Sequence, residues 1–98
     1  MQFKDISIQD FKEEFKDLRL LIDIRDQDSY NHSNIPNAQN YNSEDIMNLI
    51  KEEKRDTKIV IYCYHGNSSR KVASFLAEHG FKNVYSLIGG FDAWKDSL

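Results

Sequence analysis

The hydrophobic positions of this chain alternate between helical spacing and short continuous runs. The first helically spaced apolar residues are three or four positions apart: Ile8, Phe11, Phe15 and Leu18. Charged side chains lie between them, so the pattern predicts an amphipathic helix over residues 8–17, with Ser7 at its N-cap. The apolar run over residues 20–24 has no alternation and predicts a strand covered on both faces.

The second half of the chain repeats this order. Residues 58–63 are β-branched and apolar and form the clearest predicted strand, which ends on Cys63. Helical spacing resumes from Val72, and Gly80 fits the position just after a helix end. The shorter predicted elements are a strand at 3–6, a strand at 84–87, a turn at 89–90 and a last helical turn at 91–95.

The middle of the chain is less regular. Residues 25–40 are rich in Asp, Asn, Ser and Gln and contain the only proline, which predicts turns and a short helix rather than regular structure. Ser43 is then expected to cap a helix whose apolar face ends near Ile50.

Strands that alternate with helices predict an α/β domain with a mainly parallel sheet and right-handed crossovers. Ligands of such sheets bind beyond the carboxyl ends of the strands. Cys63 lies at such an end, on what should be a central strand. Because the 98 residues show no break in composition, we expect one domain over residues 1–98.

Composition and charge narrow the functional classes. Thirteen Lys and Arg against sixteen Asp and Glu give a net charge of −3, which argues against a general affinity for nucleic acid or anionic membranes. The sequence shows no apolar leader and no long apolar stretch, so a cytoplasmic protein is the default expectation. One cysteine and three dispersed histidines are a poor metal-binding set, and we expect neither a metal nor a cofactor.

A single cysteine cannot close an internal disulfide, so Cys63 is either an inert residue at the end of a buried strand or a reactive thiol. The polar residues 64–68 favour the reactive thiol. They can curl so that successive backbone N–H groups point inward, with the following helix aimed at the same point. Such surroundings stabilise a thiolate and lower the thiol pKa from its ordinary value of about 8.5.

The loop residues have individual candidate roles. Gly66 permits the backbone angles of a tight curl, and Asn67 tolerates left-handed geometry. Ser68 and Ser69 can cap the helix or donate to a bound anion. The positive or potentially positive residues nearest to the loop in the sequence are His65, Arg70 and Lys71.

The segment Cys63-Tyr64-His65-Gly66-Asn67-Ser68-Ser69 resembles the active-site loop of single-domain rhodaneses. Three other segments resemble motifs of this family in the same order. Residues 21–25 resemble its strand-ending Asp-x-Arg segment, 33–38 its Gly-His-Ile-Pro-Gly-Ala turn, and 89–94 its Gly-Gly-x-x-x-Trp element. Together these segments span nearly the whole chain.

The resemblance implies a rhodanese-like three-layer α/β fold with a central five-stranded sheet flanked by helices. It also implies a thiosulfate:cyanide sulfurtransferase cycle, in which Cys63 takes the outer sulfur of thiosulfate as a persulfide and passes it to cyanide or a thiol. The residues that it places around the substrate are Tyr64, His65, Gly66, Asn67, Ser68 and Arg70.

Loop length separates this family from its nearest relatives. Arsenate reductases and dual-specificity phosphatases of the same fold have a loop one residue longer, which ends in an arginine six positions after the cysteine. That position here is Ser69. Arg70 comes one residue later, where an exposed place in the first helical turn is favoured over an inward substrate ligand. The short loop therefore favours sulfur over phosphate or arsenate, which need an inward guanidinium.

Other departures concern the donor and the partners. Within the loop only His65 can carry positive charge, so thiosulfate is expected to bind weakly and another donor could be the natural one. One alternative function is a non-turnover module that relays sulfur for a partner such as a thioredoxin-like protein or a cysteine desulfurase. A phosphatase or arsenate reductase is a third, less favoured function.

The remaining polar and aromatic residues are interpreted structurally. Asp23 is read as a partner of Arg25 rather than as an acid or base. In the 33–38 turn the family's usual glycines and histidine are replaced, which is expected to tune stability. The residues assigned to the surface, to helix ends or to the core are His32, His79, Phe91 and Trp94.

Overall fold

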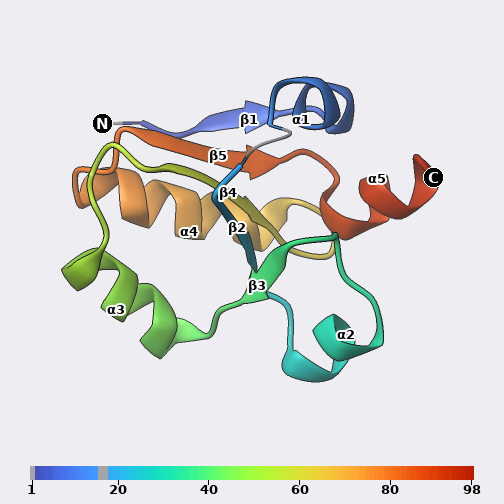
Figure 1. Cartoon of the computed structure of the whole chain (residues 1–98), viewed down its shortest axis with the longest axis horizontal. Helices are drawn as coiled ribbons and strands as arrows, with labels where there is room; N and C mark the ends of the chain where they lie inside the picture. Colours follow the sequence, from blue (N-terminus) through green and yellow to red (C-terminus); the bar gives the residue numbers. More distant parts are fainter. Residues whose placement is uncertain (1, 16–17) are drawn as a thin grey trace.

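The computed structural model describes residues 2–15 and 18–98 and shows a parallel sheet between two layers of helices (Figure 1). The strands are β1 (Lys4–Ile6), β2 (Leu20–Asp23), β3 (Ala38–Asn40), β4 (Lys58–Tyr62) and β5 (Asn83–Leu87). The helices are α1 (Ile8–Glu14), α2 (Gln27–His32), α3 (Ser43–Glu52), α4 (Asn67–Glu78) and α5 (Gly90–Asp96). The sheet order is β1-β5-β4-β2-β3, and each neighbouring pair is parallel, which confirms the predicted fold class with β4 in the centre.

Alternate residues of β4 face opposite helix layers. Val60 and Tyr62 belong to a core cluster that includes residues of α1 and α5. Ile59 and Ile61 belong to a second cluster that includes residues of α3 and α4. Because both faces of the sheet are covered, the strand reads as a continuous apolar run in the sequence.

The starts of α1 and α3 show whether the predicted N-cap residues are correct. Ser7 caps α1 as expected, with its Oγ accepting the N–H of Asp10 at 3.0 Å. The helix ends at Glu14 rather than at residue 17, and residues 16–17 lie outside the described part of the chain.

The prediction that Ser43 caps the next helix is wrong. Asn42 is the cap of α3, because its side chain accepts the N–H of Asp45 at 2.9 Å. The Asp45 carboxylate in turn accepts the N–H of Asn42 at 2.9 Å, which completes a capping box. Because of this reciprocal pair of hydrogen bonds, Asn42 is a better cap than Ser43.

The prediction of turns and a short helix over residues 25–40 is confirmed for the helix, α2, but it missed the strand β3 in the same segment. β3 is an edge strand that pairs with β2, with Leu21 opposite Ala38. The side-chain amide of Asn40 donates to the carbonyl oxygens of Asp23 and Arg25 at 3.0 and 2.9 Å. The strand is therefore held by contacts to a neighbouring segment, which its own three residues do not reveal.

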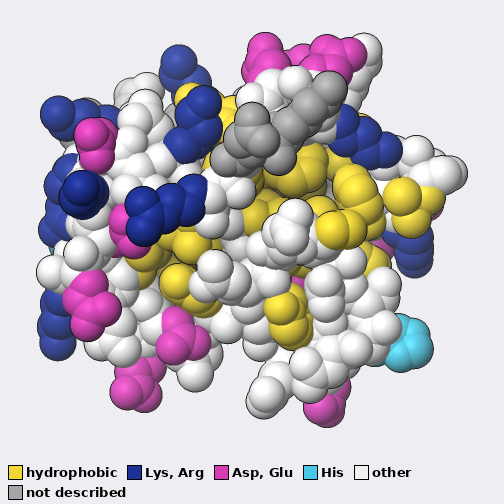
Figure 2. Space-filling view, in the orientation of Figure 1, with side chains coloured by type: hydrophobic (Ala, Val, Ile, Leu, Met, Phe, Trp, Pro, Cys, Tyr) yellow, Lys and Arg dark blue, Asp and Glu magenta, His cyan; other side chains and the backbone are white. Residues whose placement is uncertain are grey.

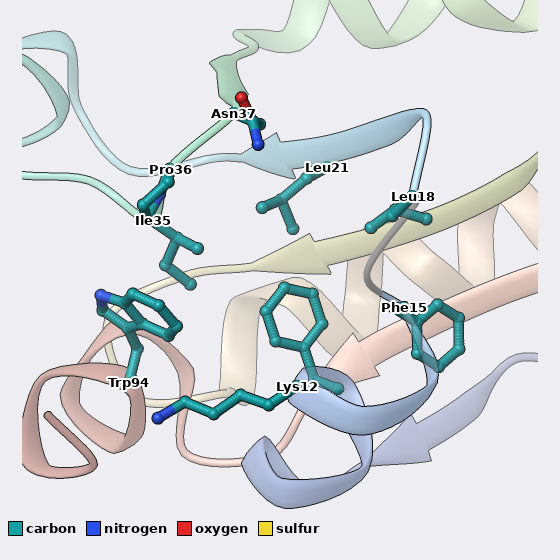
Figure 3. Close-up of a pocket in the computed structure, with 9 residues that line it drawn as sticks. Lys12, Phe15, Leu18, Leu21, Ile35, Pro36, Asn37 and Trp94 are labelled. Atoms are coloured by element: carbon teal, nitrogen blue, oxygen red, sulfur yellow. The ribbon is translucent and has the colours of Figure 1, made fainter.

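A mostly apolar cavity of about 260 Å³ opens between α1, β2 and α5 (Figure 3). Figure 2 shows hydrophobic side chains gathered on this face of the molecule. The aromatic residues of its lining are Phe11, Phe15 and Trp94. Lys12 lies at its edge, with Nζ 5.1 Å from the centre of the Trp94 ring. Cys63 does not line this cavity, so its size says nothing about the chemistry of the thiol.

The described helices include none long and apolar enough to cross a bilayer.

The N-terminal end of α5 packs directly on the backbone that follows β4. The N–H of Phe91 donates to the Cys63 carbonyl oxygen at 2.8 Å, and the N–H of Asp92 donates to that of Tyr64 at 3.1 Å. This contact requires a glycine at position 90, since a Cβ there would lie 2.4 Å from the Cys63 oxygen. The Gly-Gly motif thus allows a helix end to approach a loop backbone.

We expect Gly90→Ala to lower the free energy of unfolding by about 2–4 kcal/mol, because the backbone contact must open. Gly80→Ala is the matched control: Gly80 also has a positive φ, of 93°, but a Cβ there would meet only the Arg55 side chain, at 3.6 Å. It should cost only about 1–2 kcal/mol. Urea unfolding measures both, and equal losses would contradict the packing role of Gly90.

Candidate active site

Cys63 directly follows β4 and begins the short connection to α4. The residue is buried, and its backbone carbonyl is fixed by α5. The sulfur therefore lies at the carboxyl edge of the central strand, where the sheet topology predicts a ligand site.

The sulfur accepts the backbone N–H groups of Gly66 at 3.1 Å and Ser69 at 3.4 Å. Gly66 is the N-cap of α4, and no side chain makes the usual capping hydrogen bond. Ser69 is the third residue of this helix, whose N–H a capping side chain normally satisfies. The Cys63 sulfur therefore takes the place of a helix cap.

The environment lowers the pKa of the Cys63 thiol below its ordinary value. Burial raises this pKa, but hydrogen bonds from the side chain and backbone of Ser69 and the backbone of Gly66 together lower it by more. The positive end of α4 acts in the same direction. The nucleophilic thiolate is consequently more populated than in an ordinary cysteine.

The left-handed residue of the loop is Gly66, with φ of 101°, whereas Asn67 is the first helical residue. A Cβ at Gly66 would lie 3.0 Å from the backbone nitrogen of Gly89, so the loop and the turn before α5 meet backbone to backbone. Of the two roles expected for Ser68 and Ser69, capping the helix is wrong, because α4 begins before both, and donation to a bound anion stays a prediction. Ser68 is exposed, while Ser69 turns inward.

Ser69 and Ser86 form a buried hydroxyl pair beside the sulfur. The Ser69 Oγ lies 3.5 Å from Sγ of Cys63 and 2.8 Å from Oγ of Ser86. Ser86 was not identified from the sequence, although it stands two residues after Val84 on the same side of β5. A serine at a position that strand alternation assigns to the core was the available signal.

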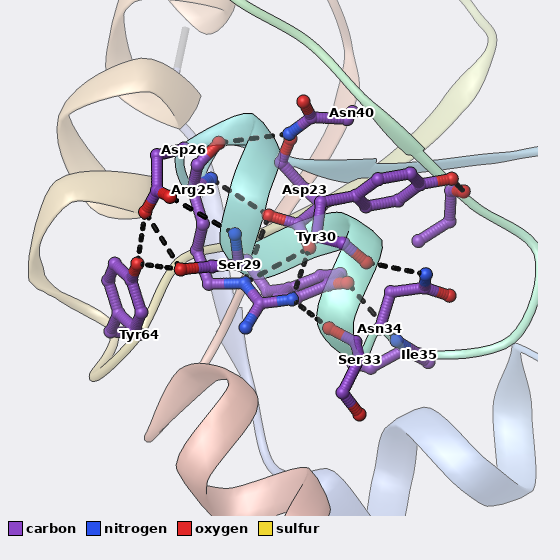
Figure 4. A network of polar contacts seen from close by, with 12 residues as sticks. Asp23, Arg25, Asp26, Ser29, Tyr30, Ser33, Asn34, Ile35, Asn40 and Tyr64 are labelled. Carbon is purple, nitrogen blue, oxygen red and sulfur yellow. Dashed lines mark hydrogen bonds and ion pairs between the residues drawn. The ribbon is translucent and has the colours of Figure 1, made fainter.

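Tyr64 connects the loop to the start of α2 (Figure 4). Its hydroxyl donates to the Asp26 carboxylate and contacts the Ser29 hydroxyl. Asp26 also accepts the N–H and the hydroxyl of Ser29, at 3.1 and 2.8 Å. The hydrogen bonds from Tyr64 and Ser29 lower the pKa of Asp26 to about 2. The entrance of the loop therefore carries a carboxylate that stays ionised at neutral pH.

Asp23 and Arg25 form a buried ion pair beneath Tyr64, as the sequence interpretation expects. The guanidinium donates to the Asp23 carboxylate at 2.8 Å and to the Ser33 carbonyl oxygen at 2.6 Å. Burial lowers the pKa of Arg25, but the hydrogen bond and charge of Asp23 raise it by more. The guanidinium carbon lies 4.1 Å from the ring centre of Phe91 and 5.5 Å from that of Tyr64. The pair thus links β2, α5 and the loop.

The other predicted site residues with basic side chains lie against carboxylates on neighbouring elements. His65 Nδ1 lies 2.6 Å from Asp92 of α5, and both side chains are exposed. Arg70 Nε lies 3.1 Å from Asp5 of β1, and its guanidinium lies over Phe3. Asn67 is exposed at the first position of α4.

Tyr64→Phe should raise the pKa of Asp26 from about 2 toward its ordinary 3.8, because the variant removes the largest contribution to the shift. A lowered carboxylate pKa stabilises the folded state above the unfolded pKa, and this stabilisation disappears as the pH falls to about 2. An NMR titration of the Asp26 carboxyl carbon measures the change.

The matched control is Tyr41→Phe, which removes a tyrosine hydroxyl from the segment before α3 and should leave Asp26 unchanged. An Asp26 titration that is the same in Tyr64→Phe and in the unmodified protein would show that the Tyr64 hydroxyl does not stabilise the Asp26 carboxylate.

Comparisons with known proteins agree with this geometry. The family model described as Rhodanese-like domain matches residues 7–97. The thiosulfate sulfurtransferase GlpE of Coxiella burnetii is 43% identical over 96 residues, which cover 97% of this chain and 90% of that protein.

Two solved structures show the same fold. A rhodanese-related protein from Thermoplasma volcanium matches with a TM-score of 0.77 and 26% identity, over 96% of this chain and 92% of that one. A protein of unknown function from Rhodopseudomonas palustris, described as a possible tyrosine phosphatase, matches with a TM-score of 0.79 and 26% identity, over 97% of this chain and 81% of that one. The family model and the near full-length similarity together establish that this chain belongs to the rhodanese-like domain family.

Proposed function

We propose that this chain is a sulfurtransferase that carries a sulfane sulfur as a persulfide on Cys63. The observation that carries this proposal is the position of the sulfur at the start of α4, where it accepts the N–H groups of Gly66 and Ser69. These donors favour the thiolate and remain available to the negative sulfur of a persulfide. The similarity to thiosulfate sulfurtransferases supports the same activity.

The reaction proceeds in two displacements. The Cys63 thiolate attacks the outer sulfur of thiosulfate, the sulfur–sulfur bond of the donor breaks, and sulfite leaves with the bonding electron pair. Cyanide or a thiolate then attacks the terminal sulfur of the persulfide, the new sulfur–sulfur bond breaks, and the Cys63 thiolate returns. Neither step needs a proton from a separate acid, so the loop acts by stabilising negative charge. We assign the surroundings of the persulfide to the loop of residues 64–68.

The position six residues after Cys63 supports sulfur chemistry over phosphoryl chemistry. Ser69 occupies it with a buried hydroxyl, while Arg70 pairs with Asp5 instead. A phosphatase loop needs a guanidinium that holds two oxygens of the substrate. We therefore do not extend the phosphatase description of the structural relative to this chain. For Arg70 we keep the proposed role of a substrate-binding residue, which requires its guanidinium to release Asp5.

The carboxylates at the loop bear on the choice of donor. The Asp26 carboxylate accepts the Tyr64 hydroxyl, and the Asp92 carboxylate lies beside the His65 ring. The one histidine of the loop therefore already faces a negative group. Both carboxylates disfavour the approach of the thiosulfate dianion. They oppose less strongly the approach of a persulfide that is carried on a protein such as a cysteine desulfurase. The sulfur would then pass onward to a thioredoxin-like acceptor. The second candidate function, a sulfur-relay module, follows from this charge distribution.

Incubation with thiosulfate should increase the protein mass by one sulfur atom, and Cys63→Ser should abolish the increase. Intact-protein mass spectrometry measures the addition, and Ser74→Ala, further along α4 than Ser69, is the control that should still react. An unchanged mass of the native protein with every donor offered, or an addition that survives Cys63→Ser, would refute the proposal.

Thiocyanate production then separates the enzyme from the relay module. Steady release of thiocyanate from thiosulfate and cyanide is expected for the enzyme. A persulfide that forms but passes only to a protein thiol would indicate the relay. Hydrolysis of an aryl phosphate that depends on Cys63 would instead support a phosphatase.

A further inference from the structure

A chain of two buried hydroxyl groups leads away from the Cys63 sulfur into the protein. The Ser69 Oγ lies 3.5 Å from the sulfur, and the Ser86 Oγ lies 2.8 Å from that of Ser69. Ser69 is 0% exposed and Ser86 is 1% exposed, so water does not compete for these hydrogen bonds. Ser86 belongs to β5, opposite Ile61 of the central strand.

The direction of these hydrogen bonds depends on the charge on the sulfur. A hydroxyl group has one proton to donate. When the sulfur is a thiolate, Ser69 donates to it, and the Ser69 oxygen must then accept from Ser86. When the sulfur carries a proton, the thiol donates to Ser69, and Ser69 donates to Ser86. A negative sulfur therefore favours Ser86 as the donor to Ser69.

We propose that Ser86 is a positioning residue for the nucleophile, which acts through Ser69 by turning the Ser69 hydroxyl proton toward the negative sulfur of Cys63. This inference deepens the proposed function and rests on the reactive thiol that it assumes. Without Ser86, the Ser69 hydroxyl loses the partner that orients it, and its rotation weakens the bond to sulfur. The Ser69 backbone N–H still donates in that case, so the effect is partial.

Among the described residues, the hydrogen bonds of the Cys63 sulfur come from neutral groups of Ser69 and Gly66, not from the charged side chains of the surrounding elements. Three pairs form there: Asp23 with Arg25 on β2 and its exit, Asp5 of β1 with Arg70 of α4, and His65 of the loop with Asp92 of α5. Beside the loop, Tyr64 is bound to Asp26. The further titratable groups on these elements are Lys4, Lys58, Tyr62, Lys71, Glu78, Tyr85, Lys95 and Asp96. In the described part of the chain the hydroxyl series ends at Ser86, so Ser86 orients a donor and does not conduct a proton outward.

The pH dependence of Cys63 alkylation by iodoacetamide tests the proposal. Ser86→Ala should raise the apparent thiol pKa by about 0.5–1 unit, the size expected for one weakened hydrogen bond. Ser69→Ala should raise it by at least as much. The double variant should match Ser69→Ala alone, because Ser86 has no route to the sulfur without Ser69. Ser74→Ala, on the same helix, should leave the value unchanged.

Ser86→Thr and Ser86→Val form a second pair of variants that differ chiefly in the hydroxyl group. Both keep a side chain in the buried space at this position of β5. Thr should keep the native pKa and Val should raise it as Ala does, so this pair decides the question if Ser86→Ala fails to fold. Unchanged pKa values in Ser86→Ala and Ser86→Val, or additive shifts in the double variant, would overturn the proposal.

Alkylation needs no sulfur transfer, so the two proposals fail separately. A protein that forms no persulfide but shows the Ser86 dependence refutes the proposed function alone. A protein that forms the persulfide with no Ser86 dependence refutes this inference alone.

Discussion

The hydrogen bonds that the first turn of α4 donates to the Cys63 sulfur determine how the carboxyl edge of the sheet is arranged. The sulfur replaces a capping side chain, so the connection between β4 and α4 must be short and must place Gly66 in the left-handed region. The N–H groups of Phe91 and Asp92 at the start of α5 donate to the carbonyl oxygens of Cys63 and Tyr64. This close contact explains the glycine at position 90. One helix end therefore stabilises the negative sulfur, and a second fixes the backbone that carries it.

Charge is distributed around this site in a way that leaves the sulfur among neutral donors. Arg25 is buried against Asp23 and the aromatic rings of Phe91 and Tyr64, where it supports the loop without contacting the thiol. The carboxylate of Asp26 faces the entrance through Tyr64. A site built in this way stabilises one compact negative sulfur better than it attracts a highly charged oxyanion. The proposed preference for a persulfide donor follows from the same arrangement.

Features that are continuous in the sequence could be predicted, and features that join distant segments could not. β4, Cys63, the loop and α4 follow one another directly, so periodicity and residue type placed the thiol at a strand end. The edge strand β3 depends on pairing with β2, and its residues Ala38–Asn40 have no strand pattern of their own. Ser86 reaches Ser69 across 17 positions and Tyr64 reaches Asp26 across 38, and only the folded sheet brings them together.

The thiol pKa of Cys63 in the native protein tests the central claim most directly. Thiolate absorbance followed over a pH titration, with Cys63→Ser as the blank, gives this value. The hydrogen bonds from Ser69 and Gly66 predict a pKa below that of an ordinary cysteine, despite the burial that opposes it. A pKa at or above that value would show that burial outweighs the donors, and would contradict the account of Cys63 as a stabilised nucleophile.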